Sequence, residues 1–209
     1  MGFYVAKSDM GRLQEGLVRA AAGPGASTLV QGEKEQLRRT LLSGEGRVEV
    51  WGDVLAHGGW KSAVRIVPTR NTNFGHLRDG WVRGIEARSK EWRDEGFRGS
   101  VDAFKGMFGG KGGVGKGRVL LLGRGREGGL RAWVEDGAGG VRGEGGGLVT
   151  RGGGMGFLGR VEDERVCRAV WMGYLAGDRV ASDEARESVV EGIMEIVERP
   201  VGTVETQVL

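Results

Sequence analysis

The sequence of 209 residues has little cysteine, histidine or proline. Its one cysteine, Cys167, excludes an internal disulfide, and with it the small secreted domains that disulfides hold together. The two histidines, His57 and His76, are far from each other and from Cys167, so no pair has the spacing of metal ligands. We therefore expect no metal site and no catalytic cysteine.

Long apolar runs are also absent. The longest aliphatic run is VLLL at residues 119–122, far short of the roughly 20 residues of a membrane-spanning helix, and contact with a membrane surface stays open. The first residues, MGFYVAKSDM, lack the charged and then apolar pattern of a signal or import segment. They are typical of the middle of a strand, so we expect the natural domain to have further residues before Met1.

Glycine, by contrast, is abundant. It supplies 43 of the 209 residues, where roughly 7% is ordinary, yet no strict collagen-like period is present. The formal net charge is +3, which is too small to indicate a nucleic-acid partner. We therefore expect no binding to nucleic acid.

The hydrophobic pattern predicts a mixed fold. We expect strands at residues 2–7, 61–69, 117–123, 130–135 and 157–161, and helices at residues 9–22, 33–43, 71–92, 100–108, 163–176 and 182–199. Several strands follow one another without an intervening helix, which indicates an α+β fold with a largely antiparallel sheet. Asn71 or Thr72 is the expected N-cap of the third helix, and Pro68 is expected to place the end of its strand at a sheet edge. Residues 137–156 are expected to form a glycine-rich surface loop inside a single domain of residues 1–209.

Two glycine-rich motifs are similar to ATP-binding and RNA-binding segments, but neighbouring residues argue against both functions. KGGVGKG at residues 111–117 is similar to the variant phosphate loop of partition-type ATPases. Gly117, however, stands where that loop needs a hydroxyl for magnesium, and the residues that follow predict a strand instead of a helix. The Arg-Gly dipeptides between residues 123 and 154 have no interleaved Phe or Tyr, unlike RNA-binding segments. ATP binding stays a hypothesis for residues 111–117 only.

The strand–helix unit at residues 64–88 carries the clearest pattern. Phe74, Leu77, Trp81 and Ile85 form one apolar face of the expected helix, and arginines surround this face. One interpretation is a core helix with a solvated basic face. The other is the wall of an apolar cleft with cationic groups at its rim, which suits a flat or long apolar ligand with an acidic end.

Four stretches together resemble the chalcone-isomerase-domain proteins of fungi, which are typically mitochondrial. They are GFYVAKSD at residues 2–9, RIVPTRNTNFGHLRDGWVRGI at 65–85, KGRVLLL at 116–122, and the segment from VCRAVWMGYLAG to the C-terminal helix and tail at 166–208. The resemblance implies an open antiparallel β-sheet with a layer of helices on one face and a cleft between them. It also implies a chain that lacks the first strands of the family's domain, and a mitochondrial protein whose import signal is not in this sequence.

The plant enzymes of this family close a chalcone into a flavanone by adding a phenolate oxygen to an enone. By resemblance, the tyrosine, lysine and asparagine of their cleft fall on Phe74, Leu77 and Trp81, and a threonine–methionine pair falls on Tyr174 and Leu175. An arginine and a threonine from earlier strands fall before the first residue of this sequence. Leu77 cannot stabilise a developing enolate, and one hydroxyl does not rebuild the site. We therefore assign no catalytic residue, and predict that these five residues line a ligand site.

The resemblance thus predicts a non-catalytic protein that binds a small hydrophobic ligand in the cleft between sheet and helices. Relatives of this fold bind fatty acids, and haem has been proposed for fungal members, so a fatty acid or a haem-like ligand is expected by resemblance only. His76 lies beside Leu77, which turns its imidazole away from the apolar face and makes a rim or surface position the expectation. The alternative is an intramolecular lyase of the chalcone isomerase type that acts on an unidentified substrate, with Tyr174 as a relocated acid.

Overall fold

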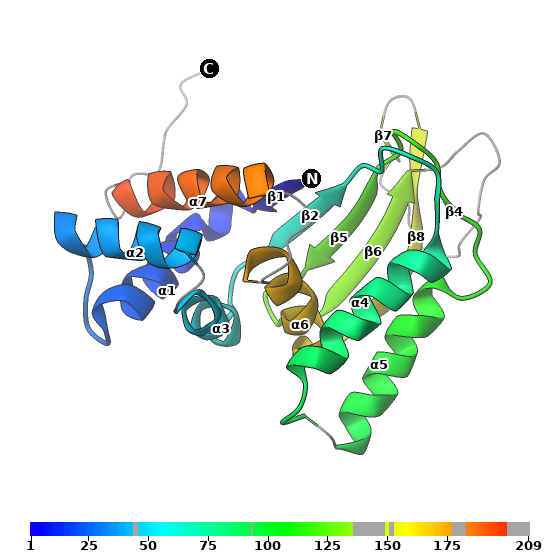
Figure 1. The fold of residues 1–209 in the computed structure, drawn as a ribbon, viewed down its shortest axis with the longest axis horizontal. Helices are drawn as coiled ribbons and strands as arrows, with labels where there is room; N and C mark the ends of the chain where they lie inside the picture. The colour runs from blue at the N-terminus through cyan, green and yellow to red at the C-terminus, as the bar shows by residue number, and fades with distance from the viewer. Residues whose placement is uncertain (44–45, 93, 136–148, 151–152, 177–182, 200–209) are drawn as a thin grey trace.

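An antiparallel sheet flanked by helices forms the molecule in a computed structural model, which describes residues 1–43, 46–92, 94–135, 149–150, 153–176 and 183–199 (Figure 1). The main sheet has six strands in the order β1-β2-β5-β6-β8-β7, and each neighbouring pair is antiparallel. These strands are β1 (Gly2–Val5), β2 (Ser62–Ile66), β5 (Leu120–Arg124), β6 (Leu130–Glu135), β8 (Gly153–Val161) and β7 (Val149–Thr150). A second sheet pairs β3 (Thr72–Asn73) with β4 (Gly113–Val114).

The described helices form two groups. The helices α4 (Phe74–Arg88), α5 (Glu95–Phe108) and α6 (Glu164–Leu175) lie against one face of the sheet (Figure 1). The other group packs together near β1 and β2, and consists of the 3-10 turn η1 (Lys7–Asp9), α1 (Met10–Ala22), α2 (Gln31–Ser43), α3 (Arg47–His57) and α7 (Asp183–Glu198). Since α3 contacts α6, the two groups meet there.

The core lies between the sheet and its helices. Along β5 and β6, buried residues alternate with partly buried ones, as expected where one face of a sheet is covered. Val166, Val170 and Trp171 on α6 are buried against this face, and the Trp171 indole Nε1 donates a hydrogen bond of 3.0 Å to the hydroxyl of Ser62 on β2. Apolar burial thus fixes α6 over the middle of the sheet.

The structure confirms the expected antiparallel α+β fold and corrects several elements. α3 is a helix that the sequence pattern does not predict. α5 begins at Glu95 and β8 at Gly153, both earlier than expected. Because β7 and the first residues of β8 are strands, the expected loop at 137–156 is wrong for those residues, and the rest of it lies outside the described residues, as does residue 182 of the last expected helix.

Two local expectations are also corrected. β2 ends at Ile66, before Pro68, and pairs with a strand on each side, so no sheet edge lies there. The cap of α4 is Asn73, whose side-chain oxygen accepts a hydrogen bond of 2.6 Å from the amide of His76. Asn71 instead accepts a bond of 2.8 Å from the amide of Lys116 in the loop before β5.

Candidate functional site

Five residues are assigned to a ligand site by the resemblance, and they lie on two helices that contact each other. Phe74, Leu77 and Trp81 share one face of α4, since residues three and four apart are neighbours on a helix surface. Tyr174 and Leu175 lie at the end of α6. The structure therefore brings the two expected halves of the site to one place, the contact between α4 and α6.

The α4 residues take part in an aromatic cluster that consists of Phe74, Trp81, Phe104 and Phe108. The ring centroid of Trp81 lies 5.1 Å from that of Phe108 and 6.1 Å from that of Phe104. Phe74, which is 2% exposed, lies 5.8 Å from Phe108. The sequence did not assign the two α5 phenylalanines to the site, although their spacing of four residues on an expected helix places them on one face.

Tyr174 supplies the one hydroxyl among the five assigned residues. It accepts a hydrogen bond of 2.8 Å from the indole Nε1 of Trp81, which joins α6 to α4. Burial raises the pKa of Tyr174 to about 12, although the bond from Trp81 acts in the opposite direction. The phenol is therefore neutral at physiological pH and far from the pKa near 7 that suits a general acid or base.

Leu77 and Leu175 are the two aliphatic side chains among the five assigned residues. Leu175 is 4% exposed, and Leu77 is partly buried and packs on the core. None of the three hollows described next is lined by any of the five residues. The assignment of the five residues to a ligand site therefore stays a prediction.

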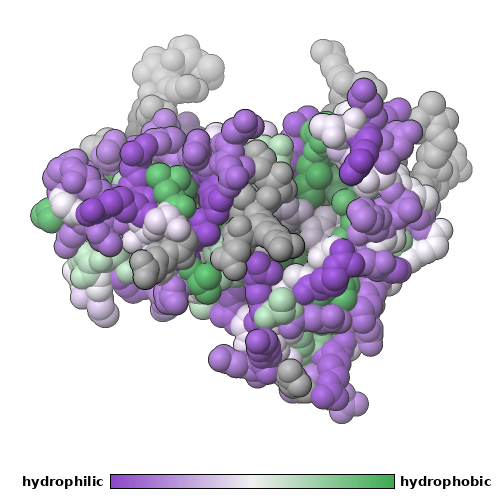
Figure 2. Space-filling model, in the orientation of Figure 1, coloured by the Kyte–Doolittle hydropathy of each residue, from purple (hydrophilic) through white to green (hydrophobic). Residues whose placement is uncertain are grey.

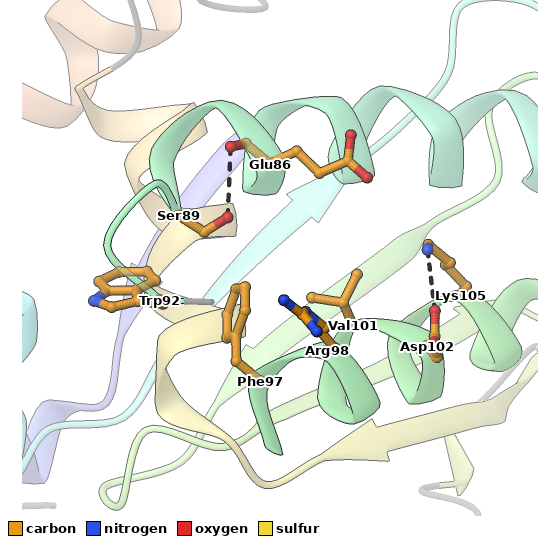
Figure 3. Close-up of a pocket in the computed structure, with 8 residues that line it drawn as sticks. All are labelled: Glu86, Ser89, Trp92, Phe97, Arg98, Val101, Asp102 and Lys105. Atoms are coloured by element: carbon orange, nitrogen blue, oxygen red, sulfur yellow. Dashed lines mark hydrogen bonds and ion pairs between the residues drawn. The ribbon is translucent and has the colours of Figure 1, made fainter. Parts of the chain in front are cut away.

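Polar residues cover most of the surface in one view of the molecule, and apolar residues appear there only in small separate groups (Figure 2). Two of the hollows in the described part of the chain have linings that mix polar and apolar residues. One, of about 420 Å³, lies between α4 and α5 and is lined by Glu86, Ser89, Trp92, Phe97, Arg98, Val101, Asp102 and Lys105 (Figure 3). Another, of about 720 Å³, is lined by Gln36, Arg39, Thr40, Leu42, Ser43 and Gly46.

The third hollow, which we name the α3–α6 groove, is more apolar. It has a volume of about 520 Å³ and is lined by Val48, Gly52, Ala87, Arg88, Trp92, Arg168, Ala169, Met172 and Ala176. α3, α4 and α6 all contribute to it, together with the loop that follows α4. The sequence did not predict this groove, because α3 was not expected.

Among the described residues, no group of three or more His, Cys, Asp or Glu side chains is placed to hold a metal ion. His57 and His76 are both exposed, as expected for His76, and neither lines any of the three hollows. No described helix is long and apolar enough to cross a membrane.

The glycine-rich segment at residues 111–117 is placed unlike a phosphate loop. It contains β4 and leads into β5, where a phosphate loop leads into a helix. The ammonium of Lys111 donates a hydrogen bond of 2.6 Å to the carbonyl of Leu158. A Cβ on Gly113 would lie 2.2 Å from the carbonyl oxygen of Thr72, so this glycine is required by the close approach of β4 to β3. The geometry thus opposes the ATPase hypothesis.

Comparison with known proteins agrees with the fold. Residues 1–190 match the family model described as chalcone isomerase like. The chain therefore belongs to the chalcone isomerase-like family, as the resemblance predicts.

Its relatives include fungal proteins. The Debaryomyces hansenii protein called altered inheritance of mitochondria protein 18, mitochondrial, is 27% identical over 197 residues, which cover 93% of this chain and 60% of that protein. The Eremothecium gossypii protein of the same name is 27% identical over 165 residues, which cover 78% of this chain and 50% of that protein. This chain thus spans less than two thirds of these relatives. Their names confirm the fungal and mitochondrial assignment.

A solved structure is similar as well. The crystal structure of an Arabidopsis thaliana fatty-acid binding protein matches with a TM-score of 0.60 at 15% sequence identity, and the match covers 93% of this chain and 77% of that one. This likeness supports the fold assignment independently of the family model.

Proposed function

We propose that this domain binds a hydrophobic ligand of the fatty-acid type at the contact between α4 and α6 and carries out no chemistry on it. The observation that carries the proposal is the hydrogen bond from Trp81 to Tyr174, because it engages the single hydroxyl among five otherwise apolar side chains. The fatty-acid binding protein with a similar fold supports the choice of ligand class.

Catalysis of the chalcone isomerase type would need groups that hold and protonate a developing enolate. Phe74, Leu77 and Trp81 carry no such group, and the pKa of Tyr174, raised to about 12, leaves its phenol a poor proton donor at neutral pH. Ligand binding would need part of the aromatic cluster to move aside, since its rings now pack on one another.

Two measurements test the proposal. Titration with cis-parinaric acid, a fluorescent fatty acid, should show saturable binding, and Trp81→Ala should weaken the binding at the α4–α6 contact at least tenfold. Trp133→Ala is the matched control, because Trp133 packs on Phe157 away from the assigned residues and should leave the affinity unchanged. Absorbance should show no conversion of a chalcone. If the parent protein forms flavanone at enzyme-like rates and Tyr174→Phe abolishes this activity, the lyase alternative is established instead.

A further inference from the structure

The α3–α6 groove has an apolar floor and shares no lining residue with the aromatic cluster. α6 contributes Ala169 and Met172, and Ala176 follows directly after this helix; all three are buried. α3 contributes Val48, which is 50% exposed. Val48 is one of the few large apolar side chains that the described residues expose. Met172 is flexible and adapts to ligands of different shape. The floor thus suits an alkyl chain.

Two guanidinium groups line the same groove. Arg168 lies over the ring of Trp92, with 4.5 Å between the guanidinium carbon and the ring centroid, and its Nη2 lies 3.2 Å from a carboxylate oxygen of Glu164. Its Nε is buried and has no hydrogen-bond partner among the described residues. Arg88 also lines the groove and uses Nη1 to donate to the carbonyl of Gly84. A buried donor without an acceptor is unfavourable, and an anionic head group would supply acceptors.

We infer that the α3–α6 groove is a second ligand site, which binds a long-chain fatty acid with its carboxylate at Arg168 and Arg88 and its alkyl chain along α3 and α6. The volume of about 520 Å³ falls in the range of roughly 300–1,000 Å³ that small-molecule sites occupy. Guanidinium groups pair with carboxylates through two parallel hydrogen bonds. No residue of this site belongs to the five at the α4–α6 contact, so either site can fail without the other.

A variant that blocks the groove tests whether the fatty acid binds there. Gly52 lies on α3 in the groove lining, and a Cβ built on it meets no atom within 4 Å. We therefore expect the ring of Gly52→Phe to occupy part of the groove. Gly99→Phe on α5 is the matched control, since its Cβ also meets nothing within 4 Å. A photoreactive palmitic acid should label groove peptides of α3 and α6 in the parent and in Gly99→Phe, and at least tenfold less in Gly52→Phe. Gly52→Leu should reduce labelling to a smaller degree.

A second experiment tests the head group. Arg168→Gln and Arg88→Gln should each lower the affinity of the groove for palmitate by roughly 10-fold, because each removes a charged hydrogen-bond donor. The affinity for hexadecanol, which has the same chain and no charge, should stay the same. A purely structural role of the arginines would lower both affinities together. The inference is overturned if groove peptides are unlabelled in the parent, if Gly52→Phe leaves the labelling unchanged, or if hexadecanol binding falls equally.

Discussion

At the scale of single residues, a buried carboxylate holds the N-terminal segment to the rest of the fold. Asp9 is 0% exposed, its Oδ1 lies 2.5 Å from Nη2 of Arg126, and its Oδ2 accepts a bond of 2.9 Å from the amide of Lys61. The bonds from Arg126 lower the pKa of Asp9 from 3.8 to about 2, although burial opposes this. The carboxylate therefore stabilises the folded state fully above about pH 4, and this contribution is lost as the pH falls towards 2.

We expect Asp9→Asn to lower the free energy of unfolding at pH 7 by about 1–2 kcal/mol, a value reduced by solvent screening at the half-exposed Arg126. Urea unfolding at pH 7, 5 and 3 measures it, and the difference from the parent should shrink at pH 3. Asp102→Asn is the control, since Asp102 is exposed and pairs with Lys105 on the same helix. An equal loss in both variants would contradict the role of Asp9.

Arg124 places a cation in the interior, where it joins α3 to the sheet. Its Nη1 and Nη2 donate to the carbonyls of Trp60 and Leu55 at 3.1 and 2.8 Å, and burial lowers its pKa. Arg124→Met keeps much of the volume but leaves two buried carbonyls without these donors, so we expect a loss of about 2–4 kcal/mol in the free energy of unfolding. Thermal unfolding measures the loss. Arg131→Met is the control, since the Arg131 side chain on the neighbouring strand β6 is more exposed, and it should change stability by less than about 0.5 kcal/mol.

At the scale of elements, strand packing explains one glycine of residues 111–117, Gly113. Gly113→Ala would place a methyl group 2.2 Å from the Thr72 carbonyl oxygen, whereas the Cβ of Gly115→Ala meets its nearest atom at 3.5 Å. We expect Gly113→Ala to cost about 1–3 kcal/mol of stability and Gly115→Ala to cost little, as measured by chemical unfolding. Neither the parent nor Lys116→Ala should bind ATP in equilibrium dialysis. Binding by the parent that Lys116→Ala abolishes would restore the phosphate-loop hypothesis.

The same pairing decides where α4 begins. Asn71, Thr72 and Asn73 are all residue types that cap helices, so the sequence alone does not choose between them. The bridge of Thr72 to Val114 and of Asn73 to Gly113 holds these residues extended, and this long-range pairing moves the cap to Asn73. We expect Asn73→Ala to cost about 1 kcal/mol and Asn71→Ala to leave the helicity of α4 unchanged. Amide hydrogen exchange in the first turn of α4 distinguishes the two variants, because it should become faster in Asn73→Ala only. Faster exchange in Asn71→Ala would contradict the assignment of Asn73 as the cap.

At the scale of the whole molecule, the sequence predicts what depends on local pattern and family resemblance, and fails where distant segments meet. The alternation of β5 and β6 and the apolar face of α4 are local, so the sheet and the position of this helix face are predictable. α3 is harder to predict, because Gly52 interrupts it and β-branched valines lower its helix propensity. Its helical form depends on burial of Trp51 and Leu55 in the core. The α3–α6 groove depends on that packing as well, and no short stretch of sequence encodes it.

Stability of the whole domain reports on both proposed sites, since a ligand that binds only the folded state raises the unfolding temperature. At a palmitate concentration of 100 times Kd, each site adds about 2.7 kcal/mol, or roughly 5–10 °C for a chain of this size. We expect the ligand-induced shift, measured by calorimetry against each ligand-free variant, to fall by about half in Gly52→Phe and in Trp81→Ala. The double variant should show no shift. If Gly52→Phe keeps the full shift and Trp81→Ala loses it, the ligand binds only at the α4–α6 contact. If Trp81→Ala keeps the full shift and Gly52→Phe loses it, the ligand binds only in the groove.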